Sequence, residues 1–189
     1  MTEQGTLFVV SAPSGAGKTT LIREVLNRFG LLSYSVSHTT RPPREGEVDG
    51  KDYFFTDPES FQALIDDDRM LEWARVHNNF YGTSKAFVED QLEEGNSIIL
   101  DIDVQGGRQI MEKDLDLVSV FIMPPSLEIL EQRLTGRGTD RDDVIQTRLD
   151  NAREEMEQRS FYDHVVVNDD LDTAVEEICA IFARAMGVS

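Results

Sequence analysis

The sequence predicts an α/β fold in which a parallel β-sheet is flanked by helices. Apolar runs rich in β-branched residues, typical of strands that are buried on both faces, recur along the chain. These runs are TLFVVSA (6–12), SYSVSH (33–38, the weakest), SIILDID (97–103), VSVFIM (118–123) and HVVVN (164–168). Segments of helical periodicity separate them: TTLIREVLNRF after the first run, GGRQIMEKD after SIILDID and LDTAVEEICAIFARAM near the end. Strands that alternate with helices in this way predict parallel neighbours joined by right-handed crossovers.

Length and composition narrow the class of protein. A chain of 189 residues is expected to form one domain around a single core. The net charge of −18, from 36 acidic and 18 basic residues, argues against a broad nucleic-acid-binding surface. No apolar stretch approaches the roughly 20 residues of a membrane span, and the N-terminus lacks the pattern of a signal peptide. Because Cys179 is the one cysteine, no intramolecular disulfide can form; we expect a cytoplasmic protein in which Cys179 belongs to the core.

Two stretches interrupt the alternation of strands and helices. Residues 37–90 carry turn signals at Pro42-Pro43 and Asp49-Gly50 and read as a small inserted subdomain. Residues 126–160 are helical and charged, and two glycines in TGRGTD permit a hinge, so this stretch reads as an arm that can move. The remaining segments, 1–36, 91–125 and 161–189, are expected to form the core of the domain.

The stretch APSGAGKTT follows the first strand and opens a helical pattern. Gly17, Lys18 and Thr19 match a phosphate-binding loop, although Ala12 stands at the position of its first glycine. In this context backbone N–H groups and a helix N-terminus would surround an anion, with Lys18 on the outer phosphates and Thr19 on magnesium. A glycine turn that merely joins strand to helix is the alternative. The predicted ATP-binding residues of this stretch are Ala12, Pro13, Ser14, Gly15, Ala16, Gly17, Lys18, Thr19 and Thr20.

Acidic and basic residues elsewhere complement such a loop. Asp101 and Asp103 end the run SIILDID, and an acid at the carboxyl end of a strand beside a phosphate loop is placed to hold magnesium. A simple strand-end cap is the alternative. The basic residues comprise 14 arginines and four lysines, and six arginines but no lysine fall in residues 126–160. Arginine suits forked recognition of phosphate, although pairing with acids on helix faces would also account for it.

Several longer segments identify a family. SVSHTTRPPREGEVDGKDYFF, EWARVHNNFYGTS, ILDIDVQG, GRGTD and VVNDDLDTA occur in order after APSGAGKTT, and from about residue 5 to 186 the chain resembles bacterial guanylate kinases. The resemblance implies a P-loop nucleoside monophosphate kinase fold with a GMP-binding subdomain (37–90) and a helical lid (126–160). It also implies a magnesium-dependent transfer of phosphate from ATP to GMP, with dGMP as a further acceptor.

The resemblance assigns residues of the inserted segment to GMP. Arg41, Arg44 and Tyr53, with Tyr81 beside them, would hold its phosphate, and two arginines three residues apart can converge on one dianion. The residues that would recognise guanine are Ser37, Glu72, Thr83 and Asp103. A carboxylate accepts hydrogen bonds from the ring N–H and exocyclic amine of guanine, where adenine offers a lone pair. From the residues alone, Glu72 beside Trp73 would read as a solvent-facing acid.

In the predicted lid the resemblance assigns Arg133, Arg137 and Arg148 to the ATP phosphates. The residues expected to be catalytic are therefore Lys18, Arg41, Arg137 and Arg148, and those expected to hold Mg²⁺ are Thr19 and Asp101. Arg141, Arg153 and Arg159 are expected to pair with neighbouring acids instead. No catalytic role is expected for His38, His77 and His164, whose spacing fits neither a metal site nor a triad.

Two other functions fit parts of the sequence. A non-catalytic guanylate-kinase-like module that binds protein partners would share the fold, but such modules have typically lost the phosphate loop that Gly17, Lys18 and Thr19 preserve here. A P-loop kinase with a sugar-phosphate acceptor would leave Ser37, Glu72, Thr83 and Asp103 without a base to recognise. ATP and GMP or dGMP are therefore the expected partners, without nucleic acid or membrane, and a homo-oligomer remains open.

Overall fold

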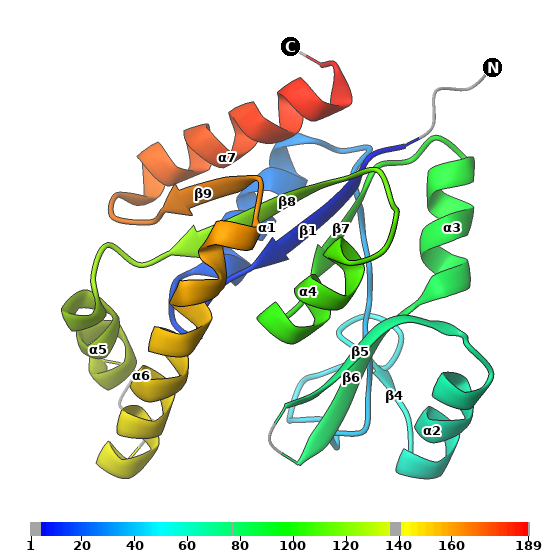
Figure 1. Cartoon of the computed structure of the whole chain (residues 1–189), viewed down its shortest axis with the longest axis horizontal. Helices are drawn as coiled ribbons and strands as arrows, with labels where there is room; N and C mark the ends of the chain where they lie inside the picture. The colour runs from blue at the N-terminus through cyan, green and yellow to red at the C-terminus, as the bar shows by residue number, and fades with distance from the viewer. Residues whose placement is uncertain (1–4, 77, 137–140, 189) are drawn as a thin grey trace.

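The computed structural model describes residues 5–76, 78–136 and 141–188. Its central element is a five-stranded parallel sheet with the order β2-β7-β1-β8-β9 (Figure 1). The strands are β1 (Leu7–Ser11), β2 (Ser33–Tyr34), β7 (Ile98–Asp101), β8 (Leu117–Met123) and β9 (His164–Val167). This sheet confirms the predicted fold class.

Helices cover both faces of this sheet, because its three central strands β1, β7 and β8 bury both sets of their alternating side chains. On one face Phe8 and Val10 pack against α1 (Lys18–Arg28) and α7 (Leu171–Met186). On the other face Leu7 and Val9 pack against α3 (Lys85–Glu93) and α4 (Val104–Met111). The rings of Phe8 and Phe182 stack with centroids 3.9 Å apart at the centre of the first face. Cys179 is buried on the same face, as predicted.

A second sheet lies within residues 38–84. Its four strands, in the order β4-β3-β6-β5, are β3 (His38–Thr39), β4 (Phe54–Phe55), β5 (Met70–Val76) and β6 (Asn79–Ser84). The helix α2 (Pro58–Asp66) begins at Asp57, whose side chain accepts a hydrogen bond from the Ser60 N–H at 2.9 Å. The prediction of one strand over 33–38 is wrong: β2 ends at Tyr34, Ser35 adds one more hydrogen bond to Ile99, and the chain then crosses to the second sheet.

Residues 127–161 form a helical pair followed by a short 3₁₀ helix. The helices α5 (Leu127–Gly136) and α6 (Asp142–Glu157) enclose a small apolar cluster of their own, and η1 (Gln158–Phe161) leads back to β9. In Figure 1 this pair and the second sheet lie on the same side of the molecule, below the five-stranded sheet. None of the helices among the described residues combines the length and apolar character that crossing a bilayer requires.

Replacing Phe182 by alanine tests the packing of the first face. The side chain is fully buried, so Phe182→Ala should lower the free energy of unfolding by about 3–5 kcal/mol, measured by urea denaturation. Leu31→Ala is the matched control, because Leu31 is 90% exposed and should change stability by no more than about 0.5 kcal/mol. Equal losses in the two variants would contradict the assigned core.

Candidate active site

The loop between β1 and α1 has the geometry of an anion-binding loop. Gly15 and Gly17 have φ of 93° and 96°, a region that favours glycine, and α1 begins immediately after Gly17. The first N–H groups of a helix have no carbonyl partner within the helix, and such groups can bind an anion. Ala12 packs at the margin of the core, so the residue that departs from the glycine pattern is accommodated at the strand end.

An asparagine at the end of β9 holds this loop. Asn168 Nδ2 donates to the Ala16 carbonyl at 2.8 Å, and the Asn168 carbonyl accepts from Arg133 Nη2 at 2.8 Å. A Cβ on Gly17 would overlap Asn168 Nδ2, so the glycine allows the close approach. Asn168 was missed by the sequence analysis, although it directly follows the apolar run HVVV at the edge where the parallel strands end.

Lys18 and Asp101 meet at the carboxyl edge of the sheet. Lys18 Nζ lies 2.7 Å from Asp101 Oδ1 and donates to the Ile102 carbonyl at 2.9 Å. Tyr34 donates its hydroxyl to Asp101 Oδ2 at 3.3 Å, and burial raises the pKa of this tyrosine. Asp101 is therefore at the predicted edge, where its carboxylate is shared between the lysine and the phenol.

One cavity of about 480 Å³ brings the two predicted nucleotide sites together. Most of the predicted residues line it: Ala12, Pro13, Ser14, Gly15, Gly17, Lys18, Thr19, Thr20, Ser37, Tyr53, Glu72, Tyr81, Asp101 and Asp103. Thr83 lies behind Glu72, and Arg41 lies beside Tyr53 with its guanidinium carbon 5.2 Å from the ring centroid. The loop after β1 and the second sheet thus line a single space.

Glu72 is buried, which overturns the interpretation of it as a solvent-facing acid. Only 4% of its surface is exposed, and Thr83 Oγ1 donates to Glu72 Oε1 at 2.6 Å. The β5–β6 register shifts between Met70 and Glu72, and from Glu72 onward β5 alternates regularly, so Glu72 faces inward while Trp73 faces out. Burial raises the pKa of Glu72 to about 7, against the opposing effect of the Thr83 hydrogen bond.

Asp103 lies next to Glu72 at the start of α4. Its Oδ1 accepts from the Gly106 N–H at 2.8 Å and its Oδ2 from Gln105 Nε2 at 3.2 Å. The aspartate therefore caps α4 while its carboxylate borders the cavity. The charge of Asp103 also raises the pKa of Glu72, after the larger effect of burial.

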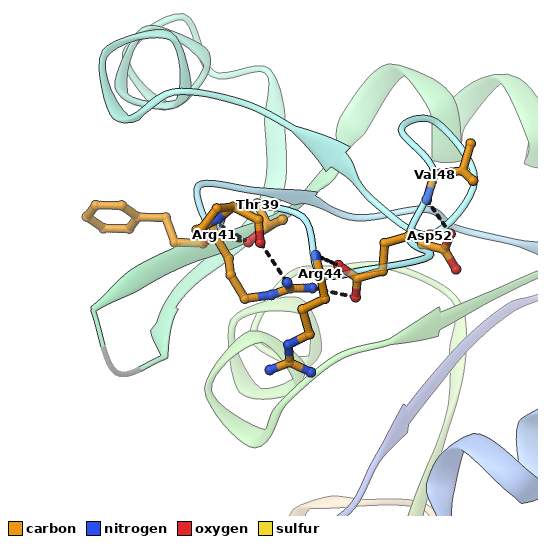
Figure 2. A network of polar contacts seen from close by, with 8 residues as sticks. Thr39, Arg41, Arg44, Val48 and Asp52 are labelled. Atoms are coloured by element: carbon orange, nitrogen blue, oxygen red, sulfur yellow. Dashed lines mark hydrogen bonds and ion pairs between the residues drawn. The ribbon is translucent and has the colours of Figure 1, made fainter.

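The arginines predicted for the acceptor phosphate share one acid. Arg41 Nη2 lies 2.8 Å from Glu47 Oε1, and the backbone N–H of Arg44 donates to Glu47 Oε2 at 2.7 Å. Figure 2 shows the guanidinium of Arg41 within this network, whereas the side chain of Arg44 extends away from it. A hydrogen bond from Val48 N–H to Asp52 Oδ2 at 2.8 Å holds the adjoining loop. Glu47 was missed by the sequence analysis, although it stands inside the quoted segment RPPREGEVDG.

The arginines of residues 126–160 are dispersed. Arg133 lies beside the phosphate loop, and Arg148 lines a neighbouring cavity of about 590 Å³ that shares Ser14, Asp103 and Glu155 with the first. Arg137 lies outside the described residues. Arg141 and Arg153 pair with acids as expected, Asp143 and Asp150, each at 3.2 Å. The expectation for Arg159 is wrong, because its Nη1 donates to the Met156 carbonyl instead.

The comparisons with known proteins agree along the whole chain. The sequence model of the guanylate kinase family matches residues 4–185. This chain belongs to the guanylate kinase family. The guanylate kinases of Geobacter sulfurreducens and Syntrophotalea carbinolica are 49% and 50% identical over 181 residues, which are 96% of this chain and 89% and 86% of theirs. A crystal structure of guanylate kinase from Anaplasma phagocytophilum superposes with a TM-score of 0.77 at 35% identity, covering 97% of this chain and 87% of that one.

Glu155 is a further acid at the site of this guanylate kinase family member. It lines both cavities, and burial raises the pKa of its carboxyl to about 7, with Asp103 adding to the shift and Lys18 opposing it. Glu155 could have been predicted from its spacing in the sequence. It follows Arg148 by seven residues, which places it two turns further along the same face of α6.

The histidines stay without an assigned role. His38 stacks on Phe54 with centroids 4.9 Å apart, and burial lowers the pKa of its imidazole. His164 begins β9 at a distance from the cavity lining, and His77 lies outside the described residues.

The buried acid makes stability depend on pH. Between the ordinary glutamate pKa of 4.5 and about 7, the folded chain retains a proton on Glu72 that the unfolded chain has released. Rising pH therefore costs stability across this window, by up to about 3 kcal/mol for this group. Urea unfolding should show Glu72→Gln gaining stability relative to the wild-type chain as the pH rises from 5 to 8. A difference that stays constant over this range would contradict the burial of a titrating carboxyl.

Proposed function

We propose that this chain transfers the γ-phosphoryl group of ATP to the phosphate of GMP, giving ADP and GDP. The observation that carries the proposal is one cavity with Lys18 and the phosphate loop on one wall and the buried carboxyl of Glu72 on the other. Membership of the guanylate kinase family supports the same reaction.

The donor half would be the loop at residues 12–20. Backbone N–H groups at the start of α1 would bind the ATP phosphates, and Lys18 would move from Asp101 toward the outer phosphates as they enter. Arg133, already beside the loop through Asn168, would add positive charge on the same side. In phosphoryl transfer these groups act by positioning and by stabilising charge rather than by covalent chemistry.

The acceptor phosphate would be held by Arg41, Arg44 and the hydroxyls of Tyr53 and Tyr81. The two tyrosine rings meet edge to face, 6.0 Å apart, with Arg41 against Tyr53. Glu47 would orient Arg41 and the Arg44 backbone before GMP arrives. An oxygen of the GMP phosphate then attacks the γ-phosphorus, the bond from phosphorus to the bridging oxygen breaks, and ADP leaves. The attacking oxygen is already ionised, so no general base is needed.

Guanine recognition would rest on Glu72 and Asp103, with Ser37 and Thr83 as hydroxyl partners. A buried carboxylate that accepts from the guanine N–H groups would be left facing a lone pair by adenine, which is costly in a desolvated site. A sugar-phosphate acceptor would leave Glu72 buried without a ligand partner, so the structure favours a base. The groups proposed here would contact the base and the phosphate, which GMP and dGMP have in common. We therefore expect dGMP to serve as an acceptor as well.

Magnesium would be held by Thr19 and Asp101. Both line the cavity and offer oxygen ligands, and Mg²⁺ in kinases is bound by one or two protein oxygens together with substrate phosphates and water. Among the described residues no cluster of three or more acidic, histidine or cysteine side chains forms a protein-only metal site. When bound, the ion would neutralise charge on the ATP phosphates.

The acceptor is tested by coupled measurement of ADP release with GMP, dGMP, AMP, UMP and no acceptor, in the presence of MgATP. GMP and dGMP should support turnover, and AMP and UMP should be poorer in kcat/KM by several orders of magnitude. No dependence on GMP would refute the proposal.

Lys18 gives a second test in the same assay. Lys18→Met should lower kcat by about 100-fold or more, because a charge that stabilises the transition state is lost while side-chain length is preserved. Lys113→Met is the matched control, since Lys113 is exposed and lies apart from the residues that line the cavity. Similar rates for the two variants would remove Lys18 from the reaction.

A further inference from the structure

We propose that Gln109 is a positioning residue for guanine recognition. Its side-chain amide forms hydrogen bonds with the backbone of Trp73 and so holds the adjacent Glu72 against the first turn of α4. The inference rests on the proposed function, because it takes Glu72 as the group that recognises guanine. Gln109 itself does not line the cavity among the described residues and would act through Glu72.

The contact is a two-point clamp. Gln109 Nε2 donates to the Trp73 carbonyl at 2.6 Å, and the Trp73 N–H donates to Gln109 Oε1 at 3.3 Å. β5 is an edge strand of the second sheet, so the outward N–H and C=O of Trp73 have no neighbouring strand. The amide of Gln109 satisfies both groups as a residue of a further strand would.

The clamp belongs to one face of α4. Asp103, Gly106 and Gln109 are spaced by three residues, so they follow one another along the same side of the helix. Asp103 caps the helix and borders the cavity, and Gly106 lies against the carboxylate of Glu72 so closely that a Cβ would overlap Glu72 Oε2. Gln109 then holds the residue next to Glu72. This face therefore carries one proposed guanine-recognition acid, Asp103, and contacts the other, Glu72, at Gly106 and through its neighbour Trp73 at Gln109.

α4 is in turn fixed to the five-stranded sheet. Two residues separate its start from the end of β7, and Ile110 is fully buried in the core against that sheet. Through α4 the position of Glu72 is set relative to Lys18 and the phosphate loop rather than by the second sheet alone. Because the carboxyl of Glu72 is costly to bury, an untethered strand would allow it to turn toward water. A small displacement of a binding group weakens recognition strongly. Gln109 would prevent such a displacement of the Glu72 carboxyl.

Gln109→Met tests the clamp, because methionine has a similar size but makes neither hydrogen bond. The KM for GMP should rise about tenfold, as expected for losing about 1.4 kcal/mol of hydrogen bonding, while kcat and the KM for ATP stay within about twofold. Gln109→Lys keeps a donor for the Trp73 carbonyl and should restore most of the GMP affinity, whereas Gln109→Glu loses that donor and should not. If the methionine variant lacks a cooperative thermal transition, the lysine and glutamate variants provide the same comparison.

Gln62→Met is the matched control. Gln62 is exposed on α2 and bonds only Asp66 of its own helix among the described residues, so its replacement should leave both KM values unchanged. An unchanged GMP KM in Gln109→Met, or equal losses for GMP and ATP, would overturn the proposed positioning role.

A double-mutant cycle with Glu72→Gln separates this inference from the proposed function. If Gln109 acts through Glu72, then Gln109→Met should add little to the GMP KM of the Glu72→Gln variant. Fully additive effects would indicate a structural role and overturn the inference alone. A normal GMP KM for Glu72→Gln by itself would instead refute the assignment of Glu72 to guanine, and the inference would fall with it.

Discussion

Parallel pairing of β1 with β7 is the constraint on which both halves of the site depend. Val10 lies opposite Asp101 in this register, so the two strands end at the same edge of the sheet. The loop that carries Lys18 therefore emerges beside Asp101, and α4 emerges from the same edge beside Asp103. Antiparallel strands would have sent the phosphate loop and the acids to opposite edges. Lys18 and the acids Asp101 and Asp103 are close together because this pair of strands runs in one direction.

The second consequence is a conflict between stability and recognition at Glu72. An empty site must hold a desolvated carboxyl against Gly106 and Thr83, and burial raises its pKa to about 7. A buried carboxyl with a raised pKa lowers the stability of the folded chain as the pH rises. The same carboxyl, once ionised, is the acceptor that a base with two N–H donors requires. Strain of this kind is expected where a surface has been shaped for a ligand rather than for the fold. The proposed role of Gln109 is to keep Glu72 facing inward through its hydrogen bonds to the neighbouring Trp73.

Local patterns were sufficient to predict the longer strands of the main sheet and the glycine-rich loop that follows β1. Apolar β-branched runs fixed four strands of the main sheet, and the run 33–38 failed because its short polar segment is divided between two sheets. Asp101 could be predicted from its place after a buried run. Asn168 bonds Ala16 and Glu47 bonds Arg41 only once the chain has folded. No sequence motif beside either residue indicates which partner it will contact. The burial of Glu72 follows the alternation of β5, but an acid next to Trp73 gives no sign in the sequence that it belongs to the buried side.

Calorimetry of GMP binding tests the central claim, that the buried carboxyl of Glu72 recognises guanine. With a pKa of about 7 in the free protein, Glu72 should lose roughly half a proton at pH 7 when guanine requires the carboxylate. Titration in buffers of different ionisation enthalpy counts the protons released, and Glu72→Gln accounts for any contribution from the GMP phosphate itself. The wild-type chain should release roughly half a proton more than the variant. Equal proton release by the two proteins would contradict the account.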